Sequence, residues 1–375
     1  MYGGGNIGRG FIGKVFSDSG YEVCFLDIMQ PLIDEMNARG GYTVRIVSNA
    51  ETVNAPVRNV RAVNASTPQA LAEIAECDIM ATAVGVNVLP KIAPVIAEGV
   101  KKRMRESGRP LDIILCENQL EADVLMRGWI NERLTEQERA WADENLGLVE
   151  ASIGRMVPPL TPQERAKDSL LICVEPYCEL PVDSAAFRGD IPDLVGLVPY
   201  TPFGFYIKRK LFLHNMGHAM VAYFAHAQGI EYIWQAVEHR EVYELARSAM
   251  RASGEALIRE YGEAMRENVE GNIDDLLQRF GNRALRDTVA RVGGDPVRKL
   301  RRNDRLVGAA LYCIEQGVDP ACIVEGIRAA LRFDRADDPT APELQAALRE
   351  RGMEYVLEHY MGLSPEEPLY KMILA

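Results

Sequence analysis

The pattern of hydrophobic and polar positions changes near the middle of the chain. Before about residue 200, short apolar runs alternate with stretches of helical periodicity, which is typical of a parallel sheet with crossover helices. After about residue 205, Ala, Glu, Arg and Leu dominate and the apolar spacing becomes helical throughout. We therefore expect two domains, an α/β domain over residues 1–200 and a mostly α-helical domain over residues 201–375.

Individual elements follow from the same pattern. Apolar runs bounded by turn residues predict strands at residues 21–26, 42–47, 57–63, 78–84, 111–116, 148–153 and 170–175, with 42–63 as a hairpin excursion. Helical spacing predicts first-domain helices at residues 6–19, 68–76 and 88–105, and one that ends at about residue 134. In the second domain it predicts helices at residues 207–228, 232–262, 271–279, 284–291, 303–316, 320–332, 341–351 and 353–360.

A glycine-rich loop opens the chain. Gly3, Gly5 and Gly8 form the pattern G-x-G-x-x-G, and a helix and a buried strand are expected to follow it. That strand ends at Asp27, which lies close to the spacing of about 20 residues expected for the acidic residue of a dinucleotide site. The combination indicates a Rossmann-type domain, whereas the glycines alone would fit an ordinary turn.

The physical reading of this loop is specific. Glycines permit a tight turn and a close backbone approach to a pyrophosphate, and the helix that begins at Asn6 and Ile7 favours its negative charge. Asp27 would accept hydrogen bonds from the adenosine ribose and would repel a 2′-phosphate. We therefore expect NAD rather than NADP as the cofactor.

One part of the fingerprint departs from its usual form. Only Met1 and Tyr2 precede the loop, although the loop should follow a strand that lies at the centre of the sheet. The first strand is therefore expected to be missing, either because the natural start lies several codons upstream or because the strand has been lost. The first explanation is favoured, since losing a central strand would leave two neighbours unpaired.

The second domain begins with a polar constellation on a predicted helix. Lys210, Asn215 and His218 lie on roughly one side of an α-helix, with His218 at about 80° and Asn215 at about 140° from Lys210. An amine that can lose its proton, beside groups that can hydrogen-bond an alcohol oxygen, suits alcohol oxidation without a metal. An amphipathic helix with a snorkelling lysine would show the same pattern.

These motifs together resemble the mannitol dehydrogenase family of polyol-specific long-chain dehydrogenases. The resemblance rests on the loop Gly3–Gly13, on K-x-x-x-x-N-x-x-H from Lys210 to His218, and on R-V-x-x-x-P-x-R-K-L followed by D-R-L from Arg291 to Leu306. It extends to about residue 340. It implies reversible hydride transfer between a nicotinamide and a secondary alcohol.

The family also implies a role for each candidate residue. Lys210 would be the general base, its pKa lowered by burial. Asn215, and by analogy Asn118 at the end of strand 111–116, would donate hydrogen bonds to the developing alkoxide, and His218 would orient the sugar hydroxyls. No metal is expected, because the pair His214 and His218 lacks the signal of a third ligand.

The resemblance, through the short chain and the loop Asn6–Phe11, implies that the substrate is a sugar phosphate, mannitol 1-phosphate, which would be oxidised to fructose 6-phosphate. Its phosphate would need fixed positive charge, for which the candidates are Arg155, Lys208, Arg209, Arg298 and Lys299. The alternatives are mannitol or fructose, a hexuronate such as fructuronate or tagaturonate whose carboxylate the same arginines could hold, and a non-catalytic NAD-binding relative.

The composition of the chain limits the kinds of partner that the protein is expected to bind. The net charge of −12 argues against binding to nucleic acid or to an anionic membrane surface, and no long apolar run indicates a membrane span. The seven cysteines are scattered without a C-x-x-C pair, which favours a reducing cytoplasm. No coiled-coil pattern predicts an oligomeric state.

Overall fold

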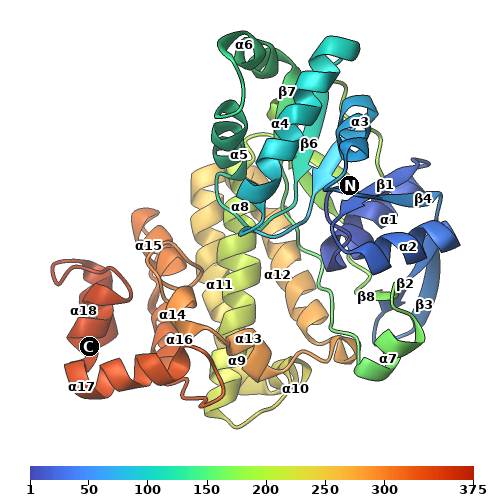
Figure 1. The fold of residues 1–375 in the computed structure, drawn as a ribbon. Helices are drawn as coiled ribbons and strands as arrows, with labels where there is room; N and C mark the ends of the chain where they lie inside the picture. Colours follow the sequence, from blue (N-terminus) through green and yellow to red (C-terminus); the bar gives the residue numbers. More distant parts are fainter. The chain divides into compact units, whose positions relative to one another are not determined.

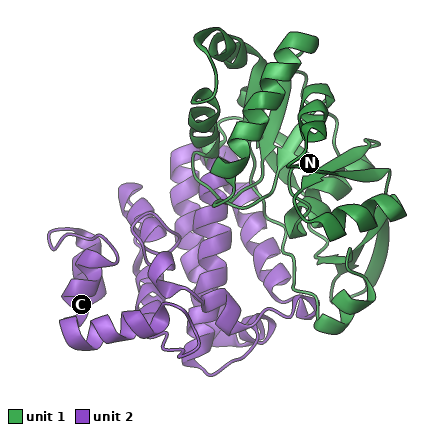
Figure 2. Ribbon diagram, in the orientation of Figure 1, with its two compact units in different colours: residues 1–204 green, residues 205–375 purple.

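The computed structural model describes residues 1–375, which form two compact units (Figures 1 and 2). Unit 1 comprises Met1–Gly204 and unit 2 comprises Phe205–Ala375. Unit 1 is built from strands and helices, and unit 2 is almost entirely helical, so the predicted fold class is confirmed. None of the helices combines the length and apolar character needed to span a bilayer.

Unit 1 contains ten strands and interleaved helices. The strands are β1 (Val23–Asp27), β2 (Gly41–Val47), β3 (Thr52–Arg58), β4 (Val60–Asn64), β5 (Met80–Thr82), β6 (Leu111–Leu115), β7 (Leu146–Glu150), β8 (Ile172–Val174), β9 (Leu180–Asp183) and β10 (Leu197–Tyr200). The helices are η1 (Gly8–Ile12), α1 (Gly13–Asp18), α2 (Gln30–Arg39), α3 (Pro68–Glu76), α4 (Leu89–Glu106), α5 (Ala122–Asn131), α6 (Glu136–Asn145), α7 (Pro162–Lys167) and η2 (Ser184–Ala186).

The main sheet of unit 1 is parallel, and at the position of its central strand only Tyr2 forms β-bridges. β4 pairs with β1 on one side, and β5, β6 and β7 pair in that order on the other. Tyr2 joins the two halves, because it forms parallel bridges to both Leu26 of β1 and Thr82 of β5. The order β4–β1–Tyr2–β5–β6–β7 matches the Rossmann order 3-2-1-4-5-6. The expected gap at the first strand is therefore occupied only at its carboxyl end.

Both faces of this sheet are covered, because successive side chains of each buried strand point to opposite faces. Phe25 packs with Phe11 and Ile12 of η1 in one core cluster. Its neighbour Leu26 packs in a second cluster with Ile96 of α4. This doubly wound arrangement brings the carboxyl ends of the strands, the glycine loop and Asp27 to one edge, where open parallel sheets bind ligands.

Several predicted boundaries in unit 1 were wrong. The strand expected at residues 57–63 is two strands, because Asn59 adopts a left-handed conformation (φ 56°) between β3 and β4. The hairpin excursion is confirmed as the antiparallel pair β2–β3. Helix α6 was not predicted because its sequence is almost entirely polar; a capping box between Thr135 and Glu138 supports its first turn.

Unit 2 is a helical domain. Its elements are α8 (Gly204–Arg209, which begins at the boundary), η3 (Lys210–Asn215), α9 (Met216–Ala227), α10 (Ile233–Glu238), α11 (Arg240–Tyr261), η4 (Glu263–Met265), α12 (Arg266–Phe280), η5 (Arg283–Leu285), α13 (Val289–Gly293), α14 (Pro296–Lys299), α15 (Val307–Glu315), α16 (Ala321–Leu331), α17 (Ala341–His359) and α18 (Pro368–Leu374). The predicted break between helices at residues 341–351 and 353–360 is a kink at Gly352 (φ 86°) within α17. The helix expected at 232–262 is interrupted at His239, whose backbone is extended.

Candidate active site

The glycine loop in unit 1 has the shape that its sequence predicts. Gly3 has a positive φ of 97°, and a Cβ atom there would lie 2.6 Å from the carbonyl oxygen of Ala83. A Cβ atom on Gly8 would lie 2.0 Å from the carbonyl oxygen of Gly3. At Gly5, by contrast, a Cβ atom would meet nothing within 4 Å. Gly3 and Gly8 thus shape the turn, while Gly5 leaves open space in which a phosphate could approach the backbone.

The first helix starts next to this space. It begins at Asn6 and Ile7, and Asn6 is exposed. It continues as the π-helix η1 into α1. Free backbone N–H groups at a helix start and its positive dipole end both favour an anion. The residues present therefore fit the pyrophosphate of a dinucleotide.

Asp27 ends β1 beside the loop. Its carboxylate accepts hydrogen bonds from the backbone N–H of Gly4 at 2.7 Å and of Met29 at 2.9 Å. A carboxylate has about four acceptor positions, so two such bonds leave capacity for ribose hydroxyls. Asp27 is therefore both a brace of the glycine loop and a possible acceptor for a ligand.

Two buried arginines also hold this region. Arg9 donates to the carbonyl oxygens of Gly4 at 2.6 Å and Leu170 at 2.7 Å. Arg155, expected at the substrate, is 5% exposed and donates to the carbonyl oxygens of Glu175 at 3.0 Å and Gly10 at 3.3 Å. The guanidinium of Arg155 is thus engaged in anchoring the glycine-loop helix, and we do not assign it to the phosphate.

Asn118 follows β6 at the carboxyl edge of the sheet, as expected, and it is exposed. Its neighbour Glu117 is buried and accepts from the Thr82 hydroxyl at 2.7 Å and the Val84 N–H at 2.9 Å. Burial raises the pKa of Glu117, while these donors and the Gly85 N–H oppose that rise. Glu117 therefore ties the loop after β5 to the strand end that carries Asn118.

The polar constellation in unit 2 lies on a helix of unusual geometry. α8, η3 and α9 form one continuous helical stretch, but the segment Lys210–Asn215 is a π-helix, in which Met216 donates to the carbonyl of Leu211. The wider π turn places residues five apart closer to one side than an α-helix does. The angle of about 140° expected from α-helix geometry for Lys210 and Asn215 is therefore wrong, and the two residues are better aligned than predicted.

His218 lies about one helical turn beyond Asn215, and its side chain is largely buried. Its side chain is 15% exposed, and its ring stacks on Phe280 at the end of α12 with ring centroids 4.5 Å apart and planes at 7°. The nearest charged partner of Nε2 is Asp287 at 3.6 Å, too far for a hydrogen bond, and Nε2 has no hydrogen-bond partner. This nitrogen is therefore available to a ligand hydroxyl.

The electrostatics around His218 favour the neutral ring. Burial lowers its pKa to about 3, and the positive charges of Arg291, Arg305, Arg279 and Lys299 contribute to the same shift. His218 is therefore uncharged at neutral pH and can exchange hydrogen bonds with a hydroxyl, but it contributes no positive charge. Four cations thus act on His218 electrostatically in a chain whose net charge is −12.

His214, the other half of the possible metal pair, is in a different setting. Its pKa is lowered well below the usual value by burial and by nearby cations, including Arg279. Its ring lies 5.9 Å from that of Phe280, between centroids. The structure contains no group of three His, Cys, Asp or Glu side chains arranged to hold a metal ion.

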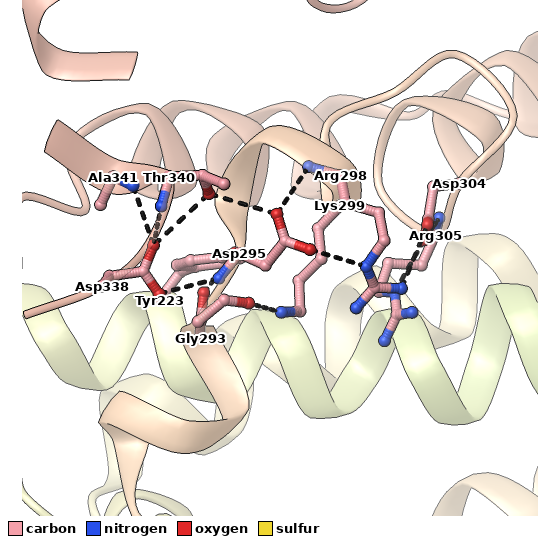
Figure 3. Close-up of polar contacts among 11 residues, drawn as sticks. Tyr223, Gly293, Asp295, Arg298, Lys299, Asp304, Arg305, Asp338, Thr340 and Ala341 are labelled. Carbon is pink, nitrogen blue, oxygen red and sulfur yellow. Dashed lines mark hydrogen bonds and ion pairs between the residues drawn. The ribbon is translucent and has the colours of Figure 1, made fainter. Parts of the chain in front are cut away.

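Lys299 is the least exposed of these cations, and Figure 3 shows its ammonium directed at a backbone carbonyl. It is 4% exposed, and its ammonium donates to the carbonyl oxygen of Gly294. Burial, together with the positive charges of Arg305 and Arg298, lowers its pKa to about 8. A buried ammonium with one backbone acceptor has two further N–H groups to offer an anion.

The neighbouring arginines differ in how they are bound (Figure 3). Arg298 pairs with Asp295 at 3.0 Å and Asp304 at 3.6 Å, and its side chain is 46% exposed. Asp295 is the N-cap of α14, so this pairing fixes the start of that short helix. Arg305 pairs only with the adjacent Asp304, at 2.8 Å, and is 17% exposed. Lys299 and Arg305 are therefore better placed than Arg298 to receive an anionic group.

Sequence reasoning missed several residues of this environment. Arg291 and Arg305 belong to the quoted motifs, but spacing alone gave no sign that they would face His218. Asp287 and Phe280 belong to no motif, and they reach the histidine only because α12 and α13 pack near α9. In addition, the Tyr223 hydroxyl of α9 donates to the Gly293 carbonyl at 2.8 Å, which ties α9 to the end of α13 (Figure 3).

Comparison with solved structures supports the fold. The chain matches D-sorbitol dehydrogenase in a substrate-free form with a TM-score of 0.77 and 17% identity, over 90% of this chain and 80% of the other. It also matches mannitol 2-dehydrogenase of Pseudomonas fluorescens, solved with NAD and D-mannitol, with a TM-score of 0.71 and 15% identity, over 99% and 89% of the two chains.

Sequence comparison extends across the whole chain. The chain is 39% identical to a mannitol-1-phosphate 5-dehydrogenase of Bacillus licheniformis, over 100% of this chain and 98% of the relative. It is 37% identical to the enzyme of that name from Brevibacillus brevis, over 99% and 95%. Residues 1–196 match the mannitol dehydrogenase Rossmann domain, and residues 204–357 match the mannitol dehydrogenase C-terminal domain. The chain therefore belongs to the mannitol dehydrogenase family.

Proposed function

We propose that this protein oxidises mannitol 1-phosphate reversibly to fructose 6-phosphate, with NAD as hydride acceptor and Lys210 as general base. The observation that carries the proposal is the neutral His218, whose Nε2 has no hydrogen-bond partner and which lies on the same helical stretch as Lys210 and Asn215. The names of the two relatives that are 39% and 37% identical agree with it.

Each side chain has a distinct part in this reaction. Lys210 Nζ takes the proton of the substrate hydroxyl as the C–H bond breaks, and it returns that proton when the ketose is reduced. Asn215, with Asn118 of unit 1, donates hydrogen bonds to the oxygen while it carries negative charge. His218 Nε2 bonds a neighbouring sugar hydroxyl and orients the chain of carbons. NAD, when bound, accepts the hydride.

The anionic end of the substrate needs cations that remain charged at neutral pH. Lys299 and Arg305 meet that need, and Arg291 adds charge although it also pairs with Asp287. A guanidinium beside an ammonium matches the oxygens of a phosphate monoester. The same cations could hold a carboxylate, so a hexuronate remains the second substrate to test.

The NAD site would comprise Gly3, Gly5, Asn6, Ile7 and Gly8 at the pyrophosphate, with Asp27 at the ribose. Asp27→Ala should raise the NADP:NAD ratio of kcat/KM, because it removes the charge that repels a 2′-phosphate. The substitution should also weaken the binding of both cofactors, because the Asp27 carboxylate accepts the hydrogen bond of the Gly4 N–H in the glycine loop. Steady-state kinetics with both cofactors measure the ratio, and Asp27→Asn serves as the control that keeps the shape. An unchanged NADP:NAD ratio of kcat/KM would show that Asp27 does not bind the ribose.

The proposed function is tested by NADH oxidation with purified protein and four ketoses: fructose 6-phosphate, fructose, fructuronate and tagaturonate. Turnover selective for fructose 6-phosphate is expected, and the same rate after dialysis against EDTA. Selective turnover of another ketose would keep the chemistry and change the substrate. Loss of activity in EDTA that zinc restores would contradict the metal-free mechanism, and silence with all four substrates, together with tight NADH binding, would favour a non-catalytic relative.

A further inference from the structure

Asp287 is a buried carboxylate of unit 2 that has no part of its own in the reaction proposed above. Its side chain is 6% exposed, and one oxygen, Oδ1, accepts a hydrogen bond from the guanidinium of Arg291, four residues further along the chain. The other oxygen, Oδ2, has no such donor and lies 3.6 Å from Nε2 of His218. Nε2 is itself buried and without a partner, so two polar atoms face each other across a gap that neither closes.

Both sides of this gap are fixed by their own surroundings. The His218 ring stacks on Phe280 with the two planes at 7°, which sets the direction of Nε2. The backbone carbonyl of Asp287 accepts from the Ile233 N–H at 2.9 Å. Arg286, the residue before it, has a φ of 53°, a left-handed conformation that a residue other than glycine keeps only where its surroundings determine it. The gap is therefore a property of the fold and not of a loose side chain.

A second histidine–aspartate pair in unit 2 shows the spacing that the same groups adopt when nothing holds them apart. Nε2 of His226 lies 3.0 Å from Asp334, a hydrogen-bond distance, although Asp334 is 71% exposed. An exposed pair gains little from closing, whereas a buried polar atom left without a partner costs free energy. The open spacing of the buried pair therefore indicates that a third group completes it.

A hydroxyl group has the chemistry that satisfies both atoms. It can donate its proton to Oδ2 and accept a hydrogen bond from an Nε2–H. An oxygen at a normal hydrogen-bond length of about 2.8 Å can contact both atoms at once, because they lie only 3.6 Å apart. Burial raises the pKa of Asp287, while the bonded guanidinium of Arg291 opposes that rise and favours the carboxylate that this role requires.

We propose that Asp287 is a substrate-binding residue, whose Oδ2 binds one sugar hydroxyl together with Nε2 of His218. The inference rests on the proposed function and names a recognition element of that site. Because Lys299 and Arg305 act on His218 and would hold the phosphate, the hydroxyl lies on the phosphate side of the reacting carbon, at C3 or C4 of fructose 6-phosphate. A position that both gives and takes a hydrogen bond discriminates strongly against a substrate without the hydroxyl.

The test uses Asp287→Asn, which keeps the shape of the side chain. Arg291 needs an acceptor, so the amide oxygen is expected to face the guanidinium and the amide N–H groups to face the gap, where the hydroxyl then has no acceptor. We expect kcat/KM for reduction of fructose 6-phosphate to fall by about 10- to 100-fold, as for loss of a hydrogen bond to a charged group. The 1-deoxy analogue should show the same loss.

The 3-deoxy and 4-deoxy analogues identify the hydroxyl. For the one that lacks the bound hydroxyl, Asp287→Asn should alter kcat/KM by less than about threefold, because the unaltered protein has no contact there to lose. The ratio of kcat/KM between two substrates in one preparation does not depend on how much of the protein is folded. It therefore separates lost recognition from lost stability.

The matched control is Asp334→Asn, which alters the exposed pair with His226 and should leave kcat/KM for every substrate within about threefold. Unchanged kcat/KM for fructose 6-phosphate in Asp287→Asn would overturn the inference. An equal loss for all three deoxy analogues would also overturn it, since Asp287 would then act only by holding Arg291. Failure of the unaltered protein to reduce fructose 6-phosphate in the same assay would instead contradict the proposed function on which the inference rests.

Discussion

Lys210→Ala is expected to lower kcat for mannitol 1-phosphate oxidation by about 10²- to 10⁴-fold, the range typical for removal of a general base. NADH affinity, measured by fluorescence titration, should stay within a factor of two to three, roughly the scatter of surface substitutions, because the glycine loop belongs to unit 1. The rising limb of the pH–rate profile should also disappear. Added methylamine should restore part of the rate, since it supplies the missing base.

The matched control is Lys208→Met, which removes an amine from the same helical stretch. Lys208 is ion-paired with Glu260 at 2.6 Å and is 33% exposed, so its loss should alter kcat by less than about threefold. A near-normal rate in Lys210→Ala would remove Lys210 from the mechanism. Loss of activity in both variants together with a lower Tm would instead indicate that the helix, not the amine, is at fault.

The second large effect is expected at Lys299. Lys299→Met should raise KM for mannitol 1-phosphate by about 10- to 100-fold, as for loss of a hydrogen bond to a charged group, with a smaller change in kcat. Lys299→Arg should recover most of the affinity, because it keeps the charge. Initial-rate kinetics measure both constants, at saturating NAD for the oxidation of mannitol 1-phosphate and at saturating NADH for the reduction of the ketoses. Equal losses for fructose 6-phosphate and fructose would contradict a phosphate role.

The pH dependence gives an independent check on Lys299. Its folded pKa of about 8 lies below the usual 10.5, so the ammonium is present below about pH 8 and is lost as the pH rises through that value. KM for the phosphorylated substrate should therefore increase above about pH 8. The Lys299→Arg variant should not show the increase, because a guanidinium keeps its proton. Thermal unfolding accompanies each measurement, since Lys299 also bonds the Gly294 carbonyl.

The hydrophobic pattern predicted the architecture because the fold depends on it. Buried runs such as β6 and amphipathic stretches such as α4 are specified by local sequence, and their predicted ranges agree with the structure within two residues at each end. Elements without such a signal were missed. The polar helix α6 is one of these, and it forms because a capping box supports its first turn.

The candidate site also contains some residues that could be predicted from the sequence and others that could not. Gly3 and Gly8 could be named from the sequence, because the turn that they shape depends on local geometry. Asp287 and Phe280 could not be named, because packing brings them to His218 from distant parts of the chain. The burial of Arg155 was equally hidden, since a buried arginine with carbonyl partners and an exposed one look alike in sequence.

The π turns in both motif-bearing segments, Gly8–Ile12 and Lys210–Asn215, have a consequence for how the chain tolerates editing. A π turn is an α-helix with one residue too many, so deleting a single residue within it lets the helix relax to its ordinary form. Such a deletion would leave the packing of both flanks intact, but it would change how residues within the turn, among them Lys210 and Asn215, lie relative to each other. A single-residue deletion in Lys210–Asn215 is therefore expected to preserve the fold of unit 2 while altering the alignment of the candidate site residues.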